Sequence, residues 1–287
     1  KMEGLKLIIA VDLGNYNIKT CEGIIFESRY QEVEKEDFDT DLLELENKFY
    51  RMESGDFENE FNKAKKNFIP NLLYAISKSC DVDNIETDLV LGVPASNLGI
   101  SEELKEKLLN KSFNFNLFEV TKNIKINKVA TVAEGLSSFY TLPKEERVKD
   151  LVILDIGGRT WNICVSSGGK CIMKFTVPGG MIDLYSEIQE DYNKLGNNAD
   201  VEEIIRLIKN DTIDASKAKE RFVKDKLNKV RLKVPNFSTY KIWGAGGGSL
   251  DLQDALRENL GNINFVPDPL FSNVKGNKLI AEAKWGK

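Results

Sequence analysis

Two stretches in different halves of the chain share one pattern, and this repetition is the strongest constraint on the fold. LIIAVDLGNYNIK runs from Leu7 to Lys19, and LVILDIGGRTWNICV runs from Leu151 to Val165. In each, a run of apolar residues ends at an aspartate (Asp12 or Asp155), and a glycine follows two positions later. The apolar runs predict buried strands, and the small residues predict tight turns. The repetition therefore predicts a duplicated fold with one strand–turn–strand unit in each half.

The residues in these turns suit a phosphate and a divalent cation. A turn of small residues lets backbone N–H groups approach a phosphate closely, and an aspartate beside it suits a hydrated divalent cation. The second stretch also carries Thr160 at the position that matches Asn17 in the first. An ordinary glycine turn is the alternative for either stretch taken alone. The pair favours two phosphate-facing loops.

A third glycine-rich segment lies near the end of the chain. Tyr240 to Trp243 predicts a strand, Gly246-Gly247-Gly248-Ser249 follows it, and Leu250 to Glu258 predicts a helix. Such a loop lets a nucleotide lie against the backbone at a helix N-terminus. A helix-initiating loop or a flexible link is the alternative. A link would not be flanked so closely by a strand and an amphipathic helix, so a ligand-binding loop is favoured.

The composition narrows the class of protein and removes several chemistries. The chain has 287 residues, of which 41% are hydrophobic and 30% charged, as is typical of soluble globular proteins. Its net charge of −5 argues against direct binding to nucleic acid. The absence of histidine excludes histidine-based triads, metal ligands and general bases. Four cysteines without CxxC spacing, and no apolar run of membrane-span length or signal peptide, predict a cytoplasmic protein without a membrane partner.

Strands alternate with helices along both halves, so the sequence predicts an α/β class. Thr131 to Tyr140 is expected to form a helix that carries Glu134. The charged segment Pro143 to Lys149 is the best candidate for a boundary. We expect one domain formed by residues 1–149 and 267–287, and a second formed by residues 150–266.

These motifs, in this order, resemble the actin, Hsp70 and sugar-kinase ATPase superfamily, and within it the ParM group of plasmid-segregation proteins. VDLGNYNIK resembles the first phosphate motif, LDIGGRTWNI the second, and IWGAGGGSL the adenosine motif. VATVAEGLSS and DPLFSNVKGNKLIAEA resemble the two connecting helices. The resemblance implies an actin-like (ribonuclease H-like) duplicated two-domain fold with a nucleotide cleft between the domains.

The resemblance also implies a set of site residues. Asp12 and Asp155 would hold Mg²⁺, largely through its waters, and Glu134 would orient or deprotonate the attacking water. The contacts to phosphate would come from Gly14, Asn15, Asn17 and Lys19, and from Gly157, Gly158 and Thr160. The contacts to the nucleoside would come from Gly246 and Gly247, and from Arg206 and Lys209 on the helix Glu203–Asn210. An arginine and a lysine on one helix are also typical of its solvated face.

The function implied by the resemblance is that of an ATPase that hydrolyses ATP or GTP with Mg²⁺ and forms filaments. Such a filament would segregate plasmid or phage DNA through a DNA-binding adaptor of the ParR type, and it requires a head-to-tail interface between copies. A small-molecule kinase of the same superfamily is one alternative, but it would need an acceptor-binding insertion that we do not find. A non-segregation actin-family scaffold is the other, and it would need an amphipathic anchor.

Two bulky residues in the second loop depart from the compact hairpin that the resemblance implies. Trp161 would pack in the core as a strand residue. Arg159 would point either to solvent or to phosphate, and the sequence leaves both directions open.

Overall fold

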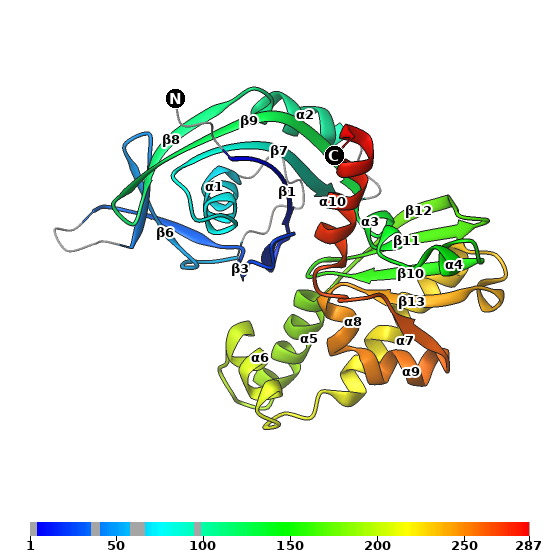
Figure 1. Cartoon of the computed structure of the whole chain (residues 1–287). Coiled ribbons are helices and arrows are strands. Elements are labelled where there is room, and N and C mark those ends of the chain that lie inside the picture. The colour runs from blue at the N-terminus through cyan, green and yellow to red at the C-terminus, as the bar shows by residue number, and fades with distance from the viewer. Residues whose placement is uncertain (1–4, 36–40, 58–66, 95–98, 287) are drawn as a thin grey trace. The chain divides into compact units, whose positions relative to one another are not determined.

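The computed structural model describes residues 5–35, 41–57, 67–94 and 99–286. It divides into two compact units, of which unit 1 comprises residues 1–140 and 273–287 and unit 2 comprises residues 141–272 (Figure 1). Each unit is built around one sheet, nine-stranded in unit 1 and five-stranded in unit 2. The limits at 149/150 and 266/267, which the sequence predicts for two functional domains, stay predictions.

Unit 1 is a curved sheet that folds around a helix. The strand order is β3-β2-β1-β7-β9-β8-β5-β6-β4, and the central strands β1, β7 and β9 are parallel. The elements are β1 (Leu5–Leu13), β2 (Asn17–Thr20), β3 (Ile25–Glu27), β4 (Tyr30–Val33), β5 (Leu42–Leu45), β6 (Lys48–Met52), α1 (Ile69–Lys78), β7 (Asn84–Val93), α2 (Gly99–Leu108), β8 (Ser112–Leu117), β9 (Val120–Ala133), α3 (Leu136–Tyr140) and α10 (Ser272–Trp285).

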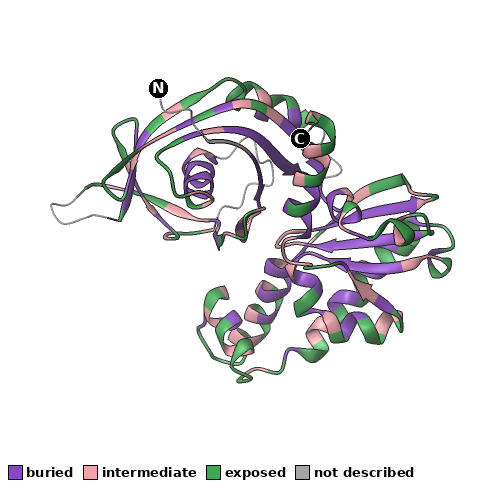
Figure 2. Cartoon of the chain, viewed as in Figure 1, coloured by how far each residue is buried: buried purple, intermediate pink, exposed green. Residues whose placement is uncertain are grey.

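The helix α1 lies inside the curve of this sheet, where it is buried on nearly every side (Figures 1 and 2). Leu72, Leu73 and Ile76 are fully buried, and they pack in one cluster with Ile9 and Val11 of β1. Burial of large aliphatic side chains stabilises a fold by about 1.5–3 kcal/mol per side chain. The apolar run predicted to be a buried strand is therefore confirmed as the centre of the unit 1 core.

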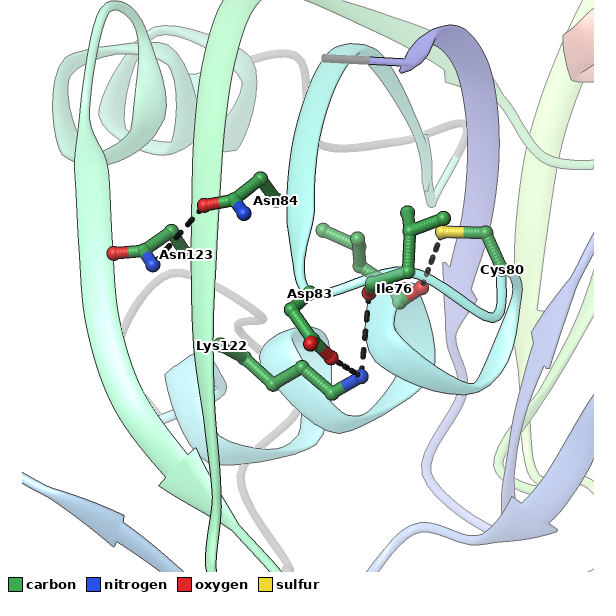
Figure 3. A network of polar contacts seen from close by, with 7 residues as sticks. Ile76, Cys80, Asp83, Asn84, Lys122 and Asn123 are labelled. Carbon is green, nitrogen blue, oxygen red and sulfur yellow. Dashed lines mark hydrogen bonds and ion pairs between the residues drawn. The ribbon is translucent and has the colours of Figure 1, made fainter. Parts of the chain in front are cut away.

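Polar contacts close the edge of the sheet at which β7 begins (Figure 3). Lys122 Nζ donates to Asp83 Oδ1 over 2.7 Å and to the carbonyl oxygen of Val82 over 3.2 Å. Asn123 Nδ2 donates to Asn84 Oδ1 over 3.2 Å. These contacts fasten β9 to β7 at the amino-terminal end of β7, so the carboxyl ends of the parallel strands lie at the opposite edge.

Unit 2 contains a sheet with the strand order β12-β11-β10-β13-β14, in which β10, β13 and β14 are parallel. Its elements are α4 (Lys144–Arg147), β10 (Leu151–Ile156), β11 (Thr160–Ser167), β12 (Lys170–Pro178), α5 (Met181–Lys194), α6 (Val201–Lys209), α7 (Ser216–Lys233), the 3₁₀ turn η1 (Phe237–Thr239), β13 (Lys241–Ala245), α8 (Gly247–Asp251), α9 (Gln253–Leu260) and β14 (Ile263–Phe265). Every residue of β10 is buried, as expected for a strand covered on both faces (Figure 2).

The same supersecondary unit opens both sheets, which confirms the predicted duplicated α/β fold. β1 pairs antiparallel with β2 and parallel with β7, and β10 pairs antiparallel with β11 and parallel with β13. Trp161 on β11 is fully buried, so its core position is also confirmed.

The helix expected over Thr131–Tyr140 is wrong in its first part. β9 continues to Ala133 in parallel register with β7, and only Leu136–Tyr140 is helical. The β-branched residues Thr131 and Val132 suit a pleated strand, and the partner strand supplies their backbone hydrogen bonds. Glu134 therefore follows a strand rather than lying within a helix. Among the described residues, no helix has both the length and the apolar character needed to cross a bilayer.

Candidate functional site

The first loop is held by the pairing of β1 with β2. Asp12 lies opposite Lys19 across this hairpin, and its side chain is buried. Gly14 begins the turn, and a Cβ atom on it would lie 2.4 Å from the carbonyl oxygen of Asn17, so only glycine fits without a shift of the backbone. The hairpin therefore brings together the predicted residues Asp12, Gly14, Asn15, Asn17 and Lys19.

Glu134 lies at the same edge of the unit 1 sheet. Its backbone nitrogen donates to the carbonyl oxygen of Val93 over 2.9 Å, which aligns the end of β9 with the end of β7. β1 lies on the other side of β7, and it carries Asp12 near its own carboxyl end. In open α/β sheets, ligands bind outside the carboxyl ends of the parallel strands. Within unit 1, both predicted carboxylates thus occupy the edge that such a ligand would use.

The second loop joins β10 to β11. Its turn is closed by a hydrogen bond of 2.9 Å from the backbone nitrogen of Gly157 to the carbonyl oxygen of Thr160. Asp155 is buried and lies opposite Ala245 of β13. A Cβ atom on Gly246 would lie 2.6 Å from Asp155 Oδ1 and 2.4 Å from the carbonyl oxygen of Ile156, and Gly246 has a φ of +75°. The glycine-rich segment after β13 therefore lies directly against the second aspartate loop.

Gly179 and Gly180, which the sequence interpretation did not assign to the site, pack against this loop. A Cβ atom on Gly180 would lie 2.4 Å from the carbonyl oxygen of Gly157 and 2.6 Å from the backbone nitrogen of Arg159. The carbonyl oxygens of Gly157 and Gly158 accept hydrogen bonds from Met181 and Ile182 in the first turn of α5. These carbonyl groups satisfy amide donors that a helix N-terminus otherwise leaves without a partner. The segment Pro178-Gly179-Gly180 after a strand was the signal that could have identified them.

Lys226 is a second residue that the sequence did not single out. It lies on α7, its side chain is 10% exposed, and its Nζ donates to the carbonyl oxygen of Pro178 over 2.9 Å. Burial lowers the pKa of this amine from its ordinary value. A Cβ atom on Gly179 would lie 2.2 Å from the amine. A buried amine therefore holds the segment Pro178-Gly179-Gly180, which packs against the second loop. In the sequence, Lys226 cannot be told apart from the other lysines of a basic helix.

Arg159 turns toward α5 rather than to solvent. Its side chain is 17% exposed, and its Nη1 lies 3.7 Å from Asp183 Oδ1. Asp183 also accepts a hydrogen bond of 2.8 Å from the backbone nitrogen of Gly180. One carboxylate thus links the arginine of the loop to the glycine that supports the loop.

Arg206 and Lys209, predicted to meet the nucleotide base, lie on α6, which packs against α5. Arg206 is largely exposed and pairs with Glu203 over 2.8 Å, and Lys209 is exposed. Gly247 begins α8, where a Cβ atom would lie 3.1 Å from Leu270 Cδ1. The contacts described for α6 do not reach this glycine loop, so the assignment of a base-binding role to Arg206 and Lys209 remains a prediction.

The donor groups fit a hydrated cation better than a fully protein-ligated one. Each loop supplies one buried aspartate, and the described part of the chain contains no cluster of three or more acidic or cysteine side chains that could hold a metal. Mg²⁺ usually keeps several of its waters and is bound by one or two carboxylates with substrate phosphates. Each aspartate by itself suits such a hydrated cation, and the assignment of one Mg²⁺ to Asp12 and Asp155 remains a prediction.

A cavity of about 760 Å³ lies at the other edge of the unit 2 sheet. Its lining includes Arg231 at the end of α7, Phe237 of η1 and Lys241, with which β13 begins. Gly246 follows the opposite end of β13. The cavity is therefore separate from the glycine loops.

Comparisons with known proteins concern the fold of the chain. Residues 10–136 match the family model for the N-terminal domain of actin-like proteins, and no curated protein matches the sequence. The archaeal actin homologue Ta0583 in complex with ADP is 17% identical, with a TM-score of 0.82 over 96% of this chain and 99% of that one. A non-polymerisable mutant of pCBH ParM is 18% identical, with a TM-score of 0.79 over 97% and 100% of the two chains. AlfA, in a filament bound to AMPPNP, is 16% identical, with a TM-score of 0.68 over 98% of each chain.

These likenesses extend over both units, whereas the family model covers most of unit 1. Sequence identities below 20% show that the fold is shared and nothing more. The family model for residues 10–136 agrees with that fold. The chain therefore has an actin-like fold, which it shares with ParM proteins, and its residues 10–136 match the N-terminal domain of actin-like proteins.

Proposed function

We propose that this protein is a nucleotide-dependent, filament-forming ATPase that converts ATP or GTP to the diphosphate and phosphate with Mg²⁺. The observation that carries the proposal is the contact between Asp155 and the glycine loop at Gly246. A buried carboxylate beside bare backbone, at the carboxyl ends of parallel strands, suits a hydrated cation and the nucleotide that it accompanies. The match to an actin-like N-terminal domain supports the same assignment.

In unit 1, the proposed chemistry divides between Glu134 and the first loop. Glu134 would orient the attacking water and accept its proton, a role that typically contributes a factor of about 10²–10⁴ in rate. The backbone N–H groups of Gly14 and Asn15, with the side chains of Asn17 and Lys19, would bind phosphate oxygens. Preorganised donors of this kind stabilise the charge that develops during transfer.

In unit 2, the second loop would bind phosphate through Gly157, Gly158 and Thr160, and Asp155 would hold the hydrated Mg²⁺. The bound cation would neutralise charge on the transferred phosphate. Gly246 and Gly247 would lie against the adenosine, and Arg206 and Lys209 would meet the base. The ADP-bound archaeal homologue supports nucleotide binding by a chain of this fold.

Self-association into a filament is supported by the neighbours. AlfA was solved as a filament with AMPPNP, and the pCBH ParM structure is of a mutant made unable to polymerise. We further propose that the cargo is plasmid or phage DNA and that a DNA-binding adaptor of the ParR type connects it to the filament in the cytoplasm. The net charge of −5 favours an adaptor over direct contact with DNA.

Sedimentation and light scattering of the purified protein test this proposal, with Mg-ATP, Mg-GTP, Mg-ADP or no nucleotide and with phosphate release measured in parallel. Pelleting that depends on nucleotide, together with hydrolysis, is the expected result. Glu134→Ala should bind nucleotide but release phosphate at least about 100-fold more slowly, so its filaments should persist. Nucleotide binding without polymer across a wide range of protein concentration would contradict the filament and redirect attention to a kinase or scaffold.

A further inference from the structure

Two buried asparagines on α10 face α3 and the end of β9. Asn273 Oδ1 accepts hydrogen bonds from Ser138 Oγ over 3.0 Å and from the backbone nitrogen of Gly135 over 3.3 Å. Asn277 Oδ1 accepts one from Ser137 Oγ over 2.5 Å. The packing is close here, because Gly276 of α10 lies against the backbone of Ser137. The two side chains are therefore held firmly and lie one helical turn apart.

The amide nitrogen of Asn277 takes no part in these hydrogen bonds. The side chain is fully buried, and its Nδ2 has no hydrogen-bond partner among the described residues. A buried donor without a partner destabilises the folded state, and in a native structure such a group calls for an explanation. Since Ser137 binds the oxygen of this amide, the nitrogen is directed to the other side.

Gly92 of β7 shows what lies on that other side. A Cβ atom on Gly92 would lie 3.6 Å from Asn277 Nδ2, 3.6 Å from Glu134 Oε1 and 3.5 Å from Glu134 Cγ. The amide nitrogen and the carboxylate thus converge over one residue that has no side chain. The opposite orientation of the amide would direct a carbonyl oxygen toward this carboxylate, which is the less favourable arrangement.

We infer that Asn277 is a positioning residue for Glu134, whose carboxylate receives a hydrogen bond from the amide nitrogen directly or through one water. This inference rests on the proposed function, because it gives Glu134 the role of activating the attacking water. Hydrogen bonds in active sites are often long before substrate binds and shorten in the reacting complex. Asn277 would then fix the direction in which Glu134 presents its oxygen to the water.

Asn277→Asp tests the inference by replacing the donor with a second carboxylate of the same size. The aspartate keeps the size of the side chain and the acceptor for Ser137. Turnover should fall about tenfold with KM unchanged, and the acidic limb of the pH–rate profile should move about one unit to higher pH, because two nearby carboxylates disfavour ionisation. Asn273→Asp is the matched control, since it keeps the acceptor for Ser138 and Gly135, and it should retain the wild-type profile.

Gly92→Ala approaches the same pair from β7. The new methyl group would make contacts of ordinary van der Waals length, so the fold should tolerate it, but it would occupy the place where the amide and the carboxylate converge. A loss of turnover equal to that of Asn277→Asp is expected. Wild-type turnover and an unchanged pH profile in both variants would overturn the inference.

A high-resolution crystal structure of the wild-type protein separates this inference from the proposed function. The expected finding is Asn277 Nδ2 within hydrogen-bond distance of Glu134 or of a water shared with it, and a nitrogen bonded to neither would overturn the inference. Absence of phosphate release from the wild-type protein would instead refute the proposed function. The two failures are thus distinguishable.

Discussion

The two aspartate loops look alike in sequence but are built differently. In the first loop, the glycine after the aspartate is required by its own turn, because a Cβ on Gly14 would lie 2.4 Å from the carbonyl oxygen of Asn17. In the second, the equivalent Gly157 has its nearest such contact at 3.4 Å, to the carbonyl oxygen of Thr160. The close approaches there occur instead at Gly180 and Gly246, which come from later segments. The same motif thus rests on local geometry in unit 1 and on long-range backbone packing in unit 2.

This difference shows that two copies of one sequence motif can be held in shape by different contacts. The contact that requires glycine in the first loop lies within its own hairpin, between Gly14 and Asn17. The second loop is enclosed by backbone from β12–α5 and β13–α8, so mutations far from it in sequence should damage it most.

The largest effect is expected from Gly180→Ala. Its Cβ would meet three backbone atoms of residues 157–159 at 2.4–2.6 Å, and backbone does not yield as a flexible side chain does. We expect a loss of about 3 kcal/mol in the free energy of unfolding, measured by urea denaturation. Gly157→Ala is the matched control and should cost less than about 1 kcal/mol. Equal losses in the two variants would remove the contrast between the loops.

Gly14→Ala should have the next largest effect. The turn must open to separate the new methyl group from the carbonyl oxygen of Asn17, and we expect a loss of about 2 kcal/mol. Nucleotide affinity, measured by titration calorimetry, should fall more than in Gly157→Ala. A variant that binds nucleotide as tightly as Gly157→Ala would show that the first loop adapts as easily as the second.

Two cysteines that are both half-buried extend the comparison to chemistry. In unit 1, burial raises the pKa of Cys21 to about 11. In unit 2, a hydrogen bond from the Cys164 thiol, aided by Lys174, lowers the pKa of Cys171 to about 7. Since the thiolate is the nucleophile, iodoacetamide near pH 8 should alkylate Cys171 at least about tenfold faster than Cys21, as peptide mass spectrometry would measure. The rate at Cys171 should decline as the pH falls below about 7, and Cys171→Ser should abolish this fast phase.

The smallest effect concerns a surface ion pair in unit 1. Lys278 of α10 donates to Glu22 over 2.7 Å, and this hydrogen bond lowers the pKa of the Glu22 carboxyl. Because the folded-state pKa is lowered, the stabilisation is present above the ordinary value of 4.5 and is lost as the pH falls through the folded value. The Lys278→Gln variant should lose about 0.5 kcal/mol in the free energy of unfolding near pH 7, and it should lose nothing in strong acid.

Lys284 is an exposed lysine on the same helix, and Lys284→Gln is the control. This variant should leave the free energy of unfolding unchanged at both pH values. A cost for Lys278→Gln that persists in strong acid would mean that the lysine acts through packing rather than through its charge.

The sequence predicted the parts of the fold that rest on local pattern. The apolar runs before Asp12 and Asp155 and the strand–glycine–helix segment at Gly246 each have a period or a turn signal of their own. The end of β9 was missed, because Val132 continues as strand only when β7 lies alongside to pair with it. Gly180 and Lys226 were missed for a related reason, since their importance lies in contacts with residues that are distant along the chain.

The crossing of α10 over α3 has a consequence for the order in which the chain folds during synthesis. Residues 273–287 belong to unit 1, yet the ribosome makes them after all of unit 2, which spans residues 141–272. Until α10 emerges, Ser137 and Ser138 lack the asparagines that they bind. A nascent chain would therefore contain all of unit 2 while unit 1 still lacks α10. The surface of unit 1 that α10 later covers would stay open to chaperones and proteases until the last residues are made.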